Sequence, residues 1–90
     1  MTTTIIPFNK PFVSESGNTY HFKVSHARKQ SFGTFVSLAD AWKYYGISNK
    51  FMLSESELDD LSRGGFGMLF LEDPVIDQHN FISVELRRAS

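Results

Sequence analysis

The chain has 90 residues, 41% of them hydrophobic and 21% charged, with a formal net charge of −1 and no cysteine. A chain of this length builds one hydrophobic core, which leaves little room for the enclosed active site of an enzyme with a large substrate. The lack of cysteine excludes disulfide frameworks, thiolate zinc sites and cysteine nucleophiles. No run of residues has the length of a membrane span or the pattern of a signal peptide, so we expect one cytoplasmic domain over residues 1–90.

The first part of the chain is predicted to form β-structure. Pro7 and Pro11 lack the N–H group that a central strand donates, so residues 4–14 are expected to form an arm or an edge strand. Along residues 20–25 apolar and polar side chains alternate, which is the period of a half-buried strand. A further strand is predicted over residues 31–36, and a polar loop that carries two fixed positive charges joins the two.

Two helices are predicted in the middle of the chain. Ser54 and Glu57 have the spacing of a capping box, so a short helix is expected to begin there and to end at Gly64-Gly65. Before it, Ser37 is placed to cap a helix that Gly46 ends. The apolar residues of that first helix have the spacing i, i+3, i+4 and i+7 of an amphipathic stripe: Leu38, Ala41, Trp42 and Tyr45.

Two strands are predicted to close the chain. Residues 66–71 are apolar on both faces, which is typical of an interior strand, and residues 81–88 alternate between apolar and polar side chains. The resulting order, ββ(β)ααββ, predicts an α+β fold in which an antiparallel sheet of four to five strands carries two short helices on one face. The predicted core consists of Phe22, Val24, Phe35, Leu38, Ala41, Trp42, Leu58, Leu61, Leu69, Ile82, Val84 and Leu86.

No pattern of catalytic or metal-binding residues is present. His21 and His26 are five positions apart, which places them on opposite faces of a continued strand, and no metal-binding histidine motif occurs. Surface histidines are therefore expected. The glycine-rich residues 62–67 leave the end of a helix, whereas a phosphate loop enters a helix N-terminus. The sequence predicts a protein that is not an enzyme and has no metal or cofactor.

One segment resembles a known DNA-binding unit. The strand over residues 20–25 is followed by a strand, a cap and a helix whose matching residues are Gly33, Thr34, Phe35, Ser37, Ala41 and Tyr45. Over about residues 20–46 the chain resembles the strand-turn-helix unit of the ethylene-response-factor type of DNA-binding domain. The resemblance implies a helix packed behind a sheet whose other face enters the major groove.

Charge is distributed unequally along the chain. Residues 1–50 carry six basic and two acidic residues, a net charge of +4, whereas residues 51–90 carry three basic and eight acidic residues, a net charge of −5. Such asymmetry can steer a charged partner. The positive half predicts, as an alternative function, a DNA-binding regulator that uses the basic hairpin 21–36 with Lys23, Arg28 and Lys29.

The negative half favours a different partner. Residues 55–77 contain seven carboxylates and one basic residue, so their net charge is −6. A solvated helix face and a surface that binds a basic protein in place of nucleic acid are both compatible with this pattern. For the second case the predicted contact residues are Glu55, Glu57, Asp59, Asp60, Glu72 and Asp73, together with the aromatic residues Tyr44, Phe51 and Phe81.

Taken together, size, charge and the lack of catalytic clusters predict a small non-enzymatic protein-binding module. The expected partner is a protein with a basic, nucleic-acid-binding surface, and no membrane is expected to take part. Phages and mobile elements encode modules of this kind to inhibit host nucleases or defence complexes, so an anti-CRISPR-like inhibitor is the predicted function. The oligomeric state stays open at this point.

Overall fold

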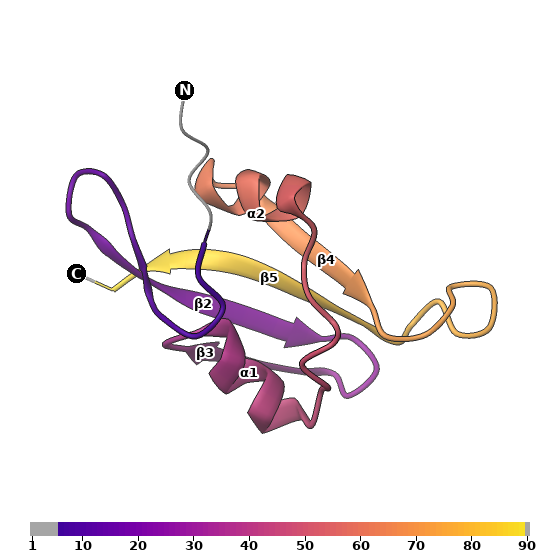
Figure 1. The fold of residues 1–90 in the computed structure, drawn as a ribbon. Coiled ribbons are helices and arrows are strands. Elements are labelled where there is room, and N and C mark those ends of the chain that lie inside the picture. Colours follow the sequence, from indigo (N-terminus) through magenta and orange to yellow (C-terminus); the bar gives the residue numbers. More distant parts are fainter. Residues whose placement is uncertain (1–5, 90) are drawn as a thin grey trace.

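Two eight-residue strands, β2 (Thr19–His26) and β5 (Phe81–Arg88), pair antiparallel along their length and form the centre of the sheet. The computed structural model describes residues 6–89 (Figure 1). Strand β4 (Phe66–Phe70) pairs with the outer side of β5. The outer side of β2 pairs with β3 (Ser31–Phe35) along one part and with the short β1 (Phe12–Val13) at its beginning. All pairings are antiparallel, as predicted.

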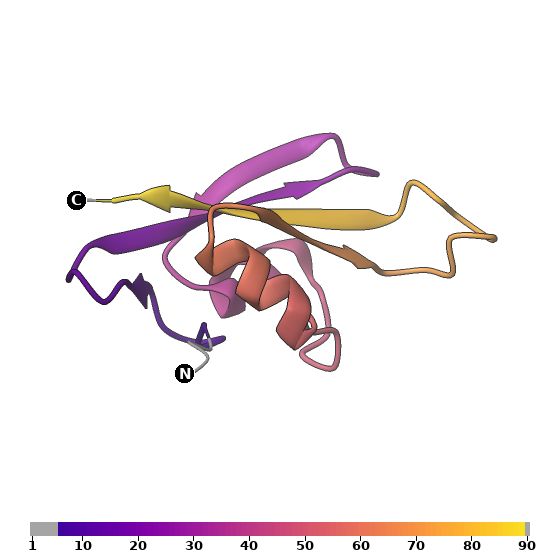
Figure 2. The same cartoon turned by 90° about the horizontal axis from the view of Figure 1, so that it is seen from above.

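Both helices cover the same face of the sheet. Helix α1 (Leu38–Tyr45) contacts β2 and β3, and helix α2 (Glu55–Ser62) contacts β4 and β5. Figure 2 shows the two helices together on one side of the sheet. The predicted α+β fold, with two short helices on one face of an antiparallel sheet, is confirmed.

Local signals in the sequence set the helix ends. The hydroxyl of Ser37 accepts the Asp40 N–H at 3.2 Å, and Gly46 ends α1 at a φ of 69°, in the left-handed region that glycine adopts without strain. Ser54 and Glu57 form the predicted capping box at the beginning of α2. The two helices therefore begin and end close to the predicted positions.

The core lies between the helices and the inner face of the sheet. Val24 and Val84 are directly opposite each other in the β2–β5 register and are fully buried. Trp42 fills the space below α1, where its indole N–H donates to the Phe51 carbonyl at 2.5 Å and its ring meets that of Phe8 edge-on. All twelve predicted core residues are buried in this core or pack against it. The buried core also contains Ile6, Phe12, Tyr45 and Leu53.

Two predictions about the sheet are wrong. The strand predicted as interior, residues 66–71, is the edge strand β4, which pairs with β5 alone among the described strands. The inner side of this strand packs below α2, whereas the phenylalanines on its other side are exposed. A strand with two apolar faces therefore lies at the edge of the sheet. His26, predicted as a surface loop residue, is instead the last residue of β2 and only 4% exposed. It continues the inward phase of Phe22 and Val24.

The arm expected over residues 4–14 is confirmed within the described part of the chain, where β1 pairs with the beginning of β2. Residues 4–5 lie outside the described range. The predicted strand over residues 31–36 ends one residue earlier, at Phe35.

Candidate interaction surfaces

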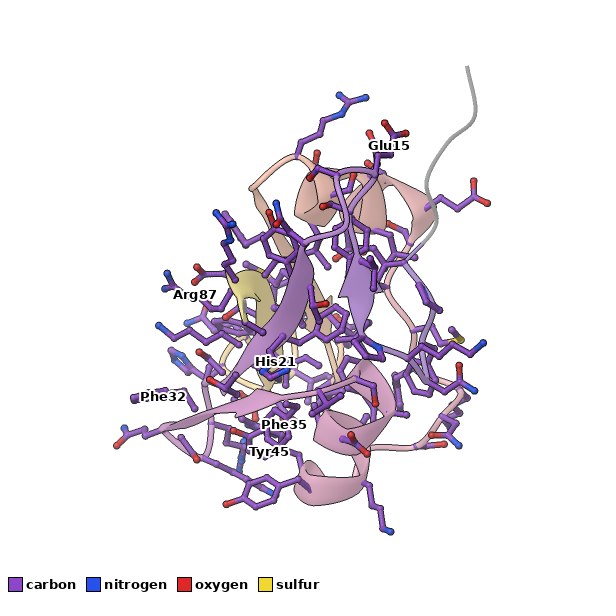
Figure 3. The ribbon with its side chains drawn as sticks, turned by 90° about the vertical axis from the view of Figure 1, so that its left-hand side faces the viewer. Glu15, His21, Phe32, Phe35, Tyr45 and Arg87 are labelled. Atoms are coloured by element: carbon purple, nitrogen blue, oxygen red, sulfur yellow. The ribbon has the colours of Figure 1, made fainter. Side chains whose placement is uncertain are left out.

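The outer face of the sheet carries no helix within residues 6–89 (Figure 2). Because side chains alternate along a strand, the residues between the core positions all point to this side. Figure 3 shows Phe32 and Arg87 projecting from it, away from Phe35 and Tyr45. We call this surface the open face; it is formed by His21, Lys23, Ser25, Phe32, Thr34, Phe66, Met68, Phe70, Phe81, Ser83, Glu85 and Arg87.

The open face mixes aromatic and charged side chains. Phe32 is 73% exposed, and the Lys23 ammonium lies 5.4 Å from the centre of its ring. Arg87 forms an ion pair with Glu85 at 3.4 Å, so the charges at this end of the face largely neutralise each other. The face is therefore amphipathic, and its net positive charge is small.

A second exposed apolar feature is the connection between β4 and β5, residues 71–80, which extends beyond the end of the sheet (Figure 1). We call it the 71–80 loop. The Asp73 carboxylate accepts the Val75 N–H at 2.9 Å, and the Asp73 carbonyl accepts the Ile76 N–H at 2.8 Å. These bonds close the turn while its apolar side chains stay outside, with Val75 93% and Ile76 78% exposed.

The predicted acidic surface is divided by the structure. Glu57 is part of the fold, since its carboxylate accepts N–H groups from Ser54 at 3.2 Å and from Met68 at 2.9 Å. Asp59 forms an ion pair with Arg63 at 3.1 Å. In the described chain only three of the six predicted carboxylates have no hydrogen bond or ion pair, and they lie on α2 and in the 71–80 loop: Glu55, Asp60 and Glu72.

The structure does not bring the three predicted DNA-binding cations together. Lys23 lies on the open face, whereas Arg28 forms an ion pair with Asp77 of the 71–80 loop. Lys29 turns toward the helix layer, where its ammonium donates to the Tyr45 carbonyl at 3.2 Å. A lysine at this position satisfies a carbonyl at the negative end of α1.

The three predicted aromatic contact residues lie in different places. Tyr44 is 70% exposed on α1, where it packs beside Phe35. Phe51 is half-buried in the segment that leads into α2, and its backbone carbonyl accepts the Trp42 indole N–H. Phe81 is half-buried at the beginning of β5, with its ring 5.6 Å from that of Phe70. Only Phe81 adjoins the 71–80 loop.

The contact residues predicted from the sequence do not include the apolar tip of the 71–80 loop. Two adjacent β-branched apolar residues between Asp73 and Asp77, in a segment rich in turn residues, were the signal that could have found it.

Within residues 6–89, no three histidine or acidic side chains converge in a group able to hold a metal ion. No helix of that range is long and apolar enough to cross a membrane. Comparison with protein-family models, with curated proteins and with solved structures finds no match.

Proposed function

We propose that this protein is a non-enzymatic protein-binding module that anchors its partner through the 71–80 loop. The observation that carries the proposal is the exposure of Val75 and Ile76, 93% and 78%, at the end of a loop closed by its own hydrogen bonds. Val and Ile are among the residues most often buried, so the exposure of two of them side by side supports an interaction site at this tip.

Burial in an apolar cleft would supply substantial binding energy. Removing one Val or Ile side chain from water contributes about 1.5–3 kcal/mol, so the pair offers roughly 3–6 kcal/mol before the costs of association. Those costs are reduced because the loop is already closed by the bonds to Asp73 and fixed to the neighbouring hairpin by the Arg28–Asp77 ion pair.

The charges beside the tip indicate what kind of partner fits. Glu72, whose carboxylate has no hydrogen bond or ion pair in the described chain, and Asp73 precede the apolar residues, with only Pro74 between them. Carboxylates repel both phosphate backbones and anionic lipid surfaces, whereas they attract a basic protein surface. The partner is thus a protein with an apolar cleft bordered by basic residues. Nucleic-acid-processing proteins bind phosphates through basic surfaces, and a protein that occupies such a surface would inhibit them.

Affinity capture from the native host, with and without nuclease treatment, tests this function. We expect the protein to retain one partner after nuclease treatment and to bind it, once purified, directly. Changing Val75→Ser together with Ile76→Ser should weaken that binding by at least about 100-fold, since each 1.4 kcal/mol corresponds to a factor of ten.

The matched control is Val13→Ser, which removes a similarly apolar side chain, 55% exposed, from β1 at the other end of β2. Its binding should equal that of the wild type. Equal affinity of the Val75/Ile76 double variant and the wild type would refute the loop as anchor, and loss of the partner on nuclease treatment would refute direct protein binding.

A second candidate function, DNA binding, is favoured by the open face. That face lies opposite α1, as the resemblance implies for a groove-binding sheet, and it carries Lys23 and Arg87. Changing both to Gln removes up to about two phosphate contacts, so the slope of log K against log salt concentration for random duplex should become shallower by up to about 2. Arg28→Gln should leave this slope unchanged. No mobility shift at low ionic strength would remove this candidate.

A further inference from the structure

A cavity of about 370 Å³ opens where the end of β2, the end of α1 and the segment before α2 meet. Its size lies at the lower end of the range for small-molecule sites. We call it the His26 pocket; its polar and aromatic walls are formed by His26, Lys29, Tyr45, Ser48, Lys50 and Phe51.

His26 supplies a buried hydrogen-bond donor. Its Nδ1 accepts the Lys29 N–H at 3.4 Å, so the proton of the neutral ring is on Nε2. Within residues 6–89, Nε2 has no hydrogen-bond partner in another residue. In the same range no fully enclosed side-chain nitrogen or oxygen lacks a partner. The imidazole is thus one of the polar groups that line the pocket, and its Nε2 is not fully enclosed.

The neutral state of His26 has a physical cause. Burial lowers the pKa of the imidazole below 6.5, and the positive charges of Lys29 and Arg28 lower it further, whereas a hydrogen bond to the backbone of His26 itself opposes them. The other titratable groups around the ring are Lys50 and Tyr45, whose ring lies 5.3 Å from it. No carboxylate is among the residues that line the pocket. The site thus concentrates positive charge and N–H donors without a compensating anion.

The two lysines have donors to spare. Lys29 uses one of its three N–H groups on the Tyr45 carbonyl, and Lys50 lies 5.2 Å from the centre of the Phe51 ring without an acidic partner in the described chain. The rest of the wall is apolar, with Ile47 and Leu71 beside the two aromatic rings. A charged head group can meet the ammonium groups while an apolar body lies on these side chains.

We propose that the His26 pocket binds a small ligand with an anionic head group, a carboxylate or a phosphate, on an apolar body of single-ring size. The head group accepts the Nε2–H of His26 and pairs with Lys29 and Lys50. Charge-assisted hydrogen bonds of this kind are stronger than neutral ones. The site is independent of the 71–80 loop tip and of the protein partner proposed above.

Phenylphosphate and phenylacetate are suitable probes, with benzyl alcohol as the neutral control. Titration of the ¹⁵N-labelled protein should shift the His26 ring nitrogens, and the bound anion should raise the pKa of His26, because it stabilises the imidazolium. Comparison of the two anions distinguishes a phosphate from a carboxylate as the preferred head group.

The variant Lys50→Gln should weaken anion binding by about tenfold, equivalent to 1.4 kcal/mol. The matched control is Lys43→Gln, an exposed lysine of α1 that does not line the pocket, and it should bind as the wild type does. The Val75/Ile76 double variant should also bind both anions normally. Equal binding of benzyl alcohol, an unchanged affinity in Lys50→Gln, or an unmoved His26 resonance at saturation of the probe would each overturn the proposal.

Discussion

The two faces of the sheet are built from the same strands but have different environments. On the covered face, Phe22 and Val24 are fully enclosed by the helices, while on the open face Phe32 of the next strand is 73% exposed. A large apolar side chain stabilises the fold only where a second layer removes it from water. An exposed apolar residue, rather than an abundance of charge, is therefore the informative feature of this surface.

The charged residues support the same conclusion. Many charges that suggested a binding surface instead hold the chain together, among them Glu57 at the edge of β4, Arg28 in its pair with Asp77, and Lys29 at the end of α1. The exposed apolar residues Val75 and Ile76 have no such internal role. The following changes test how different the covered and the open sides are.

The largest effect is expected on the covered side, from Trp42→Ala. Trp42 is 1% exposed, and the change removes its ring and its hydrogen bond to the Phe51 carbonyl. The free energy of unfolding should fall by about 3–5 kcal/mol, a large part of the 5–15 kcal/mol typical of a domain. Urea unfolding measures it. An unchanged midpoint would mean that α1 does not pack on the sheet in this way.

A smaller loss is expected at the boundary of the two faces, from Glu57→Ala. The change removes the acceptor of the Ser54 and Met68 N–H groups, and it uncovers the free edge of β4. We expect a cost of about 1–2 kcal/mol, in the range of a lost cap, and greater aggregation. Glu55→Ala, on the same helix without a partner, should change stability by no more than about 0.5 kcal/mol. Equal effects would contradict the role of Glu57.

The next effect depends on pH and comes from His26. Burial lowers its pKa in the folded protein below the ordinary 6.5, so below pH 6.5 the unfolded chain binds the proton more readily than the folded one. The contribution of His26 to the free energy of unfolding should therefore be constant above pH 6.5. It should fall as the pH drops below 6.5, by at most about 1.4 kcal/mol per pH unit.

The control for this pH effect is His26→Gln, because all other titratable groups are present in both proteins and their contributions cancel in the difference. Unfolding curves between about pH 5 and 8 give the comparison. A variant with the same pH dependence as the wild type would assign the effect to other groups.

The smallest effect is expected on the open face, from Phe32→Ala. Because the ring is already 73% exposed, its removal should change the free energy of unfolding by no more than about 0.5 kcal/mol. A loss close to that of Trp42→Ala would instead mean that the open face is covered in solution, and sedimentation at several concentrations would then identify a second copy as the cover.

Much of the fold could be predicted from local patterns. The capping box of Ser54 and Glu57, the stripe of α1 and the alternation in β2 and β5 each involve residues close in the chain, and each is present in the structure. Such patterns reflect backbone geometry that does not depend on distant partners.

The candidate sites could be predicted only in part. The sequence indicated which residues are charged, but the partners of Arg28 and Lys29 are 49 and 16 positions away. The turn signals around the 71–80 loop were visible, yet the exposure of its tip depends on how far the β4–β5 hairpin extends beyond the helices. Neither the spacing of residues along the chain nor the composition indicates these partners or the exposure of the tip.

Local propensity and periodicity act over a few residues, so the α+β class, the helix ends and the inward phase of the central strands follow from the chain's local patterns. Long-range packing, in contrast, makes residues 66–70 an edge strand, buries His26 at the end of β2, and gives some of the acidic residues partners in caps and ion pairs while it leaves others without one. These outcomes depend on which strands become neighbours, and strand order is fixed by packing of the whole core rather than by any single segment.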